Sequence, residues 1–164
     1  MITSDIKQYP MKIISGGQTG ADRAAIDAAI SRNYPIAGYC PKGRLAEDGA
    51  ISERYRLEEI TGGYRARTRK NVQTGDGTLV VYRDELKGGT ALTVSMALKE
   101  RKPLKLIDIS AVEPAVAVEK VREFCIKNRI GTLNVAGPRA SQCTDIYQYV
   151  FEVISLLLVD APAS

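Results

Sequence analysis

Near its N-terminus the chain reads Lys12-Ile13-Ile14-Ser15-Gly16-Gly17-Gln18-Thr19-Gly20-Ala21-Asp22. An apolar run leads into a glycine-rich turn and then an alanine-rich segment, which predicts a strand, a loop and a helix in that order. Such a loop presents backbone N–H groups to an anion, and its glycines let the backbone approach a ligand closely. The stretch matches neither standard phosphate-binding fingerprint, because the G-x-G-x-x-G spacing and a following Gly-Lys-Ser/Thr are both missing. It predicts a phosphate or oxyanion site, with a tight strand-to-helix turn as the alternative.

The rest of the chain alternates between short apolar runs and segments with helical periodicity. We expect strands at Met11–Ser15, Pro35–Tyr39, Thr78–Tyr82, Leu104–Ile109 and Thr132–Ala136. We expect helices at Ala21–Arg32, Tyr64–Thr74, Thr90–Arg101, Glu113–Asn128 and Asp145–Leu158, with a long irregular section at Cys40–Gly63. Continuous apolar runs are typical of strands buried on both faces of a parallel sheet. The pattern predicts one domain over residues 1–164, with an α/β, doubly wound, three-layer fold around a mostly parallel sheet of about five or more strands.

The composition excludes several classes of chemistry. The 164 residues include no histidine, which removes a Ser-His-Asp triad, a histidine acid–base pair and most zinc sites. Cys40, Cys125 and Cys143 are widely spaced and odd in number, so we expect reduced thiols rather than a disulfide framework. The net charge of +4 suits an anionic small ligand and is too diffuse to indicate nucleic acid. No membrane span or signal-peptide core is evident, so we expect a cytoplasmic protein.

Polar loops follow four of the five expected strands. They are Gly16–Gly20, Pro41–Arg44, Gly88–Thr90 and Gly137–Ser141. In a doubly wound sheet the carboxyl ends of the strands share one edge, and ligands bind there. Glycines, hydroxyls and basic side chains in four such loops are hard to explain by packing alone, so we expect a ligand site at this edge.

Several blocks of sequence, in a fixed order, resemble the putative molybdenum carrier family. They are Gly16–Arg23, Cys40–Arg44, Ala46–Gly49, Gly77–Leu79, Gly88–Thr90 and Asn134–Arg139. That family is a bacterial, Rossmann-like group in a wider superfamily of nucleotide-ligand binders, which includes the lysine-decarboxylase-like phosphoribohydrolases. The resemblance extends from about Met11 to Val153, and therefore covers nearly the whole chain.

The resemblance implies a Rossmann-like carrier or binding protein that holds an anionic, nucleotide-like ligand on its glycine-rich loops. The implied ligand is molybdenum cofactor, a pterin with a phosphate and a metal-oxo group; otherwise it is an unknown nucleotide or phosphate-containing molecule. Such binding needs N–H donors and cations but no nucleophile, so we assign no catalytic residue and no resident metal. We expect the ligand to be bound by Gly16, Gly17, Gln18, Thr19, Gly20, Asp22, Lys42, Arg44, Arg67, Gly88, Gly89, Thr90, Arg139 and Ser141.

Two other functions remain open. Gly88-Gly89-Thr90 resembles part of the phosphoribohydrolase signature, but Val94 and Ser95 stand near the position of its catalytic glutamate. An N-glycosidic nucleotide hydrolase would therefore need another carboxylate, Asp22, Asp48 or Asp84. The third possibility is a sensor of a nucleotide-derived signal that acts through its oligomer. Members of the family resemble homo-oligomers. In the last helix, Leu156 and Val159 lie beyond the one apolar stripe that would pack on the sheet, so we expect a dimer or tetramer. We expect no nucleic-acid or membrane partner.

Several of the polar side chains have two interpretations. Asp22 either caps the first helix or meets a hydroxyl or amine of the ligand, and capping is slightly favoured. Lys42 and Arg44 either reach an oxyanion or are solvated. Arg67 lies in a block that resembles the family's Tyr-x-x-Arg-Thr-x-x-Asn, which makes it the member of its basic run that we expect to face the site or a subunit contact.

Acidic residues in the long loop also have two interpretations. Glu47, Asp48 and Glu53 could bind a divalent ion together with a phosphate, but we expect them to be solvated loop residues.

Overall fold

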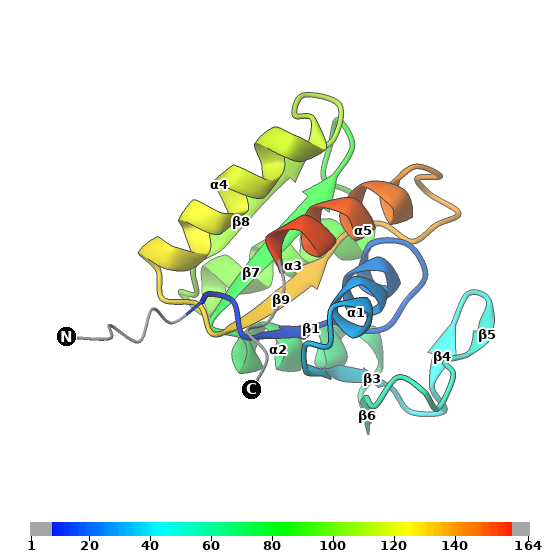
Figure 1. The fold of residues 1–164 in the computed structure, drawn as a ribbon. Helices are drawn as coiled ribbons and strands as arrows, with labels where there is room; N and C mark the ends of the chain where they lie inside the picture. The colour runs from blue at the N-terminus through cyan, green and yellow to red at the C-terminus, as the bar shows by residue number, and fades with distance from the viewer. Residues whose placement is uncertain (1–7, 159–164) are drawn as a thin grey trace.

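The structure, a computed structural model that describes residues 8–158, is built on one five-stranded sheet (Figure 1). Its order is β2-β1-β9-β7-β8, and every pair of neighbours is parallel. The bounds are β1 Lys12–Ile14, β2 Ile36–Ala37, β7 Gly77–Tyr82, β8 Leu104–Asp108 and β9 Thr132–Ala136. The predicted α/β class with a parallel sheet is therefore confirmed.

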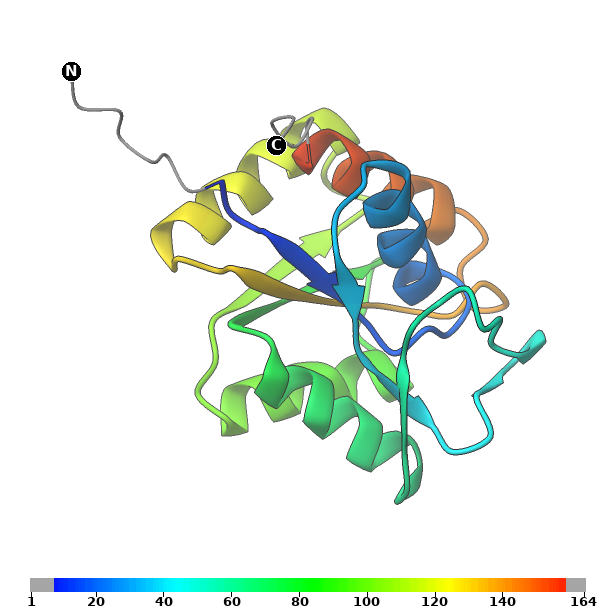
Figure 2. The same ribbon diagram turned by 60° about the horizontal axis from the view of Figure 1, so that its bottom comes forward.

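Helices cover both faces of the sheet and complete a Rossmann-like three-layer fold. The helices are α1 Ala21–Ser31, α2 Gly63–Thr74, α3 Gly88–Lys99, α4 Pro114–Lys127 and α5 Ile146–Leu157. Figure 2 shows α1, α4 and α5 on one face and α2 and α3 on the other, with α5 between its two neighbours. Because β1 and β7 lead into helices on opposite faces, a ligand crevice is expected at the carboxyl edge near them.

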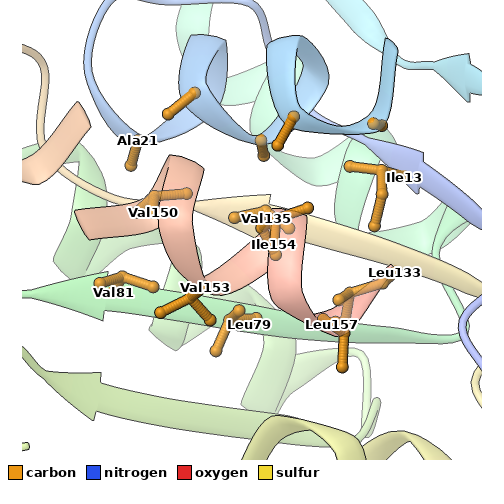
Figure 3. Packing of buried hydrophobic residues seen from close by; sticks show 14 of the residues in the cluster. Ile13, Ala21, Leu79, Val81, Leu133, Val135, Val150, Val153, Ile154 and Leu157 are labelled. Carbon is orange, nitrogen blue, oxygen red and sulfur yellow. The ribbon is translucent and has the colours of Figure 1, made fainter. Parts of the chain in front are cut away.

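The main core lies between the sheet and the layer of α1, α4 and α5 (Figure 3). Leu79, Leu133 and Val135 of the sheet are fully buried, as is Ile154 of α5. Each such aliphatic side chain stabilises the fold by about 1.5–3 kcal/mol through removal from water. The buried face of α1 consists mostly of alanines, whose small side chains let the helix lie close to α5.

One strand prediction is wrong. Pro35–Tyr39 was expected to be continuous, but β2 ends at Ala37 and a separate strand, β3 (Tyr39–Pro41), pairs in parallel with β6 (Glu58–Ile60). Gly38 separates the two strands with a φ of 138°, and a Cβ there would overlap the carbonyl of Ser15. Only glycine combines this backbone conformation with such a close approach.

The section predicted as irregular holds further structure. Besides β3 and β6 it contains a hairpin, β4 (Leu45–Ala46) and β5 (Gly49–Ala50). Helix α3 also begins at Gly88, two residues before the predicted Thr90, so the glycines start the helix rather than precede it.

The last helix uses its apolar stripe within the domain, where it packs against α1 and α4. Leu156 remains 40% exposed, and Val159 lies outside the described residues. The expected dimer or tetramer stays a prediction. Within residues 8–158, no helix combines the length and apolar character needed to cross a membrane.

Candidate functional site

A cavity of about 310 Å³ opens at the carboxyl edge of the sheet, beyond the ends of β1 and β9. The starts of α1 and α3 and one side of α2 form its walls. Seven predicted site residues line it: Gly16, Gln18, Asp22, Arg67, Gly89, Thr90 and Arg139. Segments far apart in the sequence therefore meet at the place where the topology predicts ligand binding.

Arg67 is a mostly buried cation in this cavity, with a side chain that is 14% exposed. Its Nη1 lies 3.4 Å from Asp22 Oδ2, and its guanidinium lies over the ring of Tyr64. Its Nε is buried and finds no acceptor among the described residues. A guanidinium carries five N–H donors, and an unsatisfied buried donor calls for an explanation. Arg67 therefore retains donor capacity for an anion.

Asp22 lies in the first turn of α1 and is also buried. Burial raises the pKa of its carboxyl to about 6, although the guanidinium of Arg67 acts in the opposite direction. Its Oδ2 also accepts a bond from the N–H of Gln18 at 3.4 Å. The carboxyl therefore changes charge close to neutral pH, and it can accept a hydrogen bond when ionised or donate one when protonated.

The glycine-rich loop directs its N–H groups at the protein itself. The N–H of Gly17 donates to Ser15 Oγ at 3.3 Å, and the N–H of Gln18 donates to the Asp22 carboxylate. The N–H of Thr19 donates to the side-chain Oε1 of Gln18 at 3.0 Å. The anion held by this loop is thus the carboxylate of Asp22. Gly16 and Gln18 line the cavity, while the N–H groups of Gly17, Gln18 and Thr19 bond within the protein.

The start of α3 is different, because it is open to the cavity. Thr90 and Ala91 donate to the carbonyl of Lys87, whereas no acceptor in the described chain takes the N–H of Gly88 or Gly89. A Cβ at Gly89 would meet nothing within 4 Å, and its φ is ordinary, so neither packing nor strain requires glycine there. Free N–H groups at a helix N-terminus beside open space suit an anion.

Glu47 joins three loops at the mouth of the site. From the turn of the β4–β5 hairpin it accepts bonds from the hydroxyl of Thr19 and from the N–H and hydroxyl of Ser141. The next residue, Asp48, pairs with Arg23 of α1 at 2.6 Å. Both carboxylates are exposed, as expected for loop residues, and donors far away in the sequence also bond to both. Glu53 is exposed, and the described residues contain no cluster of three or more metal-ligating side chains.

The chain is similar to known proteins in sequence and in fold. A model of the circularly permutated YpsA SLOG family matches residues 13–158. The chain belongs to this family. A crystal structure of a putative molybdenum carrier protein from Syntrophus aciditrophicus SB is 44% identical, with a TM-score of 0.91 over 94% of this chain and 99% of that one. The resemblance to the carrier family is confirmed. No curated protein matches the sequence.

The remaining predicted site residues of this YpsA-type SLOG protein lie outside the cavity lining, namely Gly17, Thr19, Gly20, Lys42, Arg44, Gly88 and Ser141. Arg44 is half-buried, and its guanidinium donates to the carbonyls of Ile51, Ser52, Tyr55 and Leu57. Lys42 is exposed. Gly17 packs against Leu57, and Thr19 and Ser141 hold Glu47.

Sequence reasoning missed other residues that line the cavity of the SLOG fold. Tyr64, Thr68 and Asn71 belong to the same sequence block as Arg67, but only Arg67 was assigned to the site. Their helical spacing puts all four on one face of α2, which could have assigned the others as well. Asn134 was also missed, although an amide inside an apolar strand is itself a signal. Its Nδ2 donates to the hydroxyl of Thr78 at 3.2 Å.

Proposed function

We propose that this protein binds an anionic, nucleotide-like ligand in the cavity and acts as its carrier. The observation that carries the proposal is the state of Arg67, a mostly buried guanidinium with an unpartnered Nε and one long contact to Asp22. Because a buried charge is costly unless it is paired and hydrogen-bonded, an anion that completes its coordination would bind favourably.

The residues that line the cavity form two groups, and each group suits a different part of a ligand. Arg67, the open N-terminus of α3 and Arg139 at the exposed rim suit a phosphate. Asp22, which is buried beside Arg67 in the cavity lining, suits a hydroxyl or ring N–H. A phosphate attached to a polar ring system satisfies both parts, and a phosphorylated pterin and a nucleotide share this chemistry.

Molybdenum cofactor is the ligand that we favour, since the similar crystal structure is named as a putative molybdenum carrier protein. The lining supplies cations, hydroxyls, amides and one carboxylate, and it contains no cysteine. With no histidine in the chain, the cavity offers neither thiolate nor imidazole to the metal. These residues fit the phosphate and the ring of the cofactor and leave the metal unligated by the protein, which suits a cargo that must be released.

A nucleotide N-glycosidase is the second candidate, and the raised pKa of Asp22, about 6, favours it. A carboxyl that titrates near the working pH can act as a general acid or base. Asp22 is the one carboxylate in the cavity lining, whereas Asp48 is paired with Arg23 and Asp84 lies outside this cavity. Val94 and Ser95 do not line the cavity either, so the glutamate of the hydrolases has no substitute on α3.

Two measurements separate the candidates. Mass spectrometry of protein purified without denaturation should identify a co-purifying pterin or nucleotide. Chromatography of nucleoside 5′-monophosphates after long incubation with the protein should show no free base, since loss of a placed acid or base lowers a rate by about 10²–10⁴. Steady release of base that Asp22→Asn abolishes would overturn the carrier function and support the glycosidase.

A further inference from the structure

One face of the sheet is incompletely covered at β8, the strand at its edge. In the described part of the chain, three helices pack on the other face, whereas α2 and α3 alone pack on this one (Figure 2). Leu104 and Leu106 of β8 point to the face of α2 and α3, because they alternate with Ile107, which is buried in the main core. Leu104 packs against Met96 and Ala97 of α3 and their neighbours, but Leu106 remains 38% exposed. The proposed function does not use this surface.

Helix α3 extends the uncovered surface with an apolar stripe. On the side of α3 that faces α2, Met96 packs with Val72. Ala91, Val94 and Leu98 recur at spacings of three and four residues, which places them together on the opposite side, toward the open edge at β8. Leu98 is 65% exposed, the largest fraction among the large apolar side chains of the described residues. A stripe of this kind beside an exposed leucine is typical of a contact with another protein.

The stripe is complementary to itself when two copies of α3 run antiparallel. A two-fold axis near Val94 would set Leu98 of one helix against Ala91 of the other, so the larger side chain of each copy meets the smaller one. This alternation allows two helices to pack at the usual interaxial distance of about 8–10 Å. The helix of the second copy would then take the uncovered place beside α3 and shield Leu106.

The charges at the two ends of α3 favour the same orientation. Lys99 and Arg101 are exposed at the end of the helix, whereas Asp84 and Glu85 are exposed just before its start. Lys87 pairs with Glu85 at 3.1 Å, and Asp84 has no ion pair within residues 8–158. An antiparallel arrangement places the basic end of each helix beside the acidic segment of the other, whereas a parallel one would bring like charges together.

We propose that this protein forms a dimer in which the α3 helices of two copies pack antiparallel about a two-fold axis near Val94. Leu98 and Leu106 are buried between the copies. The occupant of the surface is a second copy of this chain, because both the apolar stripe and the charges that flank it complement themselves. This interface is separate from α5, whose apolar stripe packs within the domain.

Sedimentation equilibrium over a range of protein concentrations measures the dissociation constant of the dimer. Leu98→Glu should raise this constant by at least about tenfold, because it places a carboxylate in the apolar contact of each copy. Leu156→Glu is the matched control, since Leu156 is exposed on α5 and the same substitution there should leave the constant unchanged. Both substitutions are at exposed positions, so both variants should fold, and thermal melting checks this.

Val94→Cys tests the position of the axis, because a residue near a two-fold axis lies beside its own copy. A short bis-maleimide should link this variant into a covalent dimer and leave Ile126→Cys, exposed on α4, unlinked. The native cysteines are buried, and the parent protein gives the background of the reaction.

Three results would overturn the proposal: a monomer at every concentration, a dimer that Leu98→Glu leaves intact, or linkage of Val94→Cys no greater than that of Ile126→Cys. None of them bears on ligand binding by the cavity, so the proposed function is tested separately.

Discussion

The guanidinium of Arg67 occupies the space that a side chain at Gly16 would fill, because a Cβ at that glycine would overlap its Nη1. Gly16 lies in the loop that follows β1, whereas Arg67 comes from α2 on one face of the sheet. Through this gap Arg67 reaches Asp22, at the start of α1 on the other face. The first glycine of the loop thus admits a protein cation, the one that we propose binds the ligand.

Arg67→Ala should weaken nucleotide binding by about 10–100-fold, because charge-assisted hydrogen bonds contribute about 1.5–3 kcal/mol. Arg65→Ala is the control. It removes the same charge from the same helix, but Arg65 is exposed to solvent. Titration with GDP or ADP measures both. Equal losses in the two variants would mean that net charge, rather than a placed guanidinium, attracts the ligand.

Gly89→Asp should fold normally and lose anion binding. The space beside Gly89 is open, so the carboxylate can be accommodated where it would repel a phosphate. Gly89→Ala is the matched control and should retain both fold and most of the affinity. A Gly89→Asp variant that binds as tightly as the parent would remove the start of α3 from the site.

Gly17→Ala should instead lower the free energy of unfolding by about 1 kcal/mol or more. Gly17 has a φ of 76°, and a Cβ there would lie 2.6 Å from Leu57 Cδ1. Urea denaturation gives the change. Parent-like stability would show that the loop adjusts freely and that its glycine is not needed for packing.

The main sheet could be predicted because each of its strands is a short apolar run that can be recognised from local sequence alone. Thr132–Ala136 matches β9 at both ends, and the other strands of the sheet differ by a few residues at most. Strands β3 and β6 escaped prediction because residues distant in sequence stabilise them: the side chain of Asn71, on α2, bonds to both backbone groups of Tyr39. The hairpin depends in the same way on Arg44 and Glu47.

The site was predictable in its location but not in its internal partners. Parallel topology gathers the loops after the strands at one edge, which brought seven expected residues into one cavity. The pairing of Asp22 with Arg67 joins residues 45 positions apart, and no local pattern specifies it. In the same way, no local pattern shows that the N–H groups of Gly17 and Gln18 bond to Ser15 and Asp22.

Glu47→Gln should loosen the mouth of the cavity. The substitution removes the negative charge that strengthens the bonds from Thr19 and Ser141. Hydrogen exchange should become faster in the β4–β5 hairpin and in residues 139–142, while the central sheet is unchanged. Glu53→Gln, in the same loop region but exposed, should exchange like the parent. Identical exchange in both variants would show that the carboxylate does not hold the loops.

Asp22 should make stability fall as pH rises from about 4 to about 6. Its folded pKa, about 6, exceeds the unfolded value of 3.8, so between these values the folded state binds more protons and loses stability as they dissociate. At 1.36 kcal/mol per pKa unit the loss reaches about 3 kcal/mol. Asp22→Asn cannot titrate, so its advantage over the parent should grow across this window in urea denaturation. If the free energies of unfolding of the parent and of Asp22→Asn changed in parallel with pH, the raised pKa of Asp22 would be contradicted.

The same carboxyl should couple ligand affinity to pH. An anion placed near Arg67 is repelled by ionised Asp22 but not by the protonated form, so binding should raise the pKa of Asp22 further and take up a proton. Affinity should therefore increase as pH falls from 7.5 to 5.5, by up to about tenfold for one coupled group. ADP-ribose is a suitable probe, because its diphosphate diester keeps its charge over this range, whereas a terminal phosphate titrates near pH 6. Asp22→Asn should bind with little dependence on pH, and the control Asp76→Asn, at the opposite edge of the sheet, should keep the slope of the parent. A slope that survives in Asp22→Asn would assign the proton to another group and remove Asp22 from the anion's surroundings.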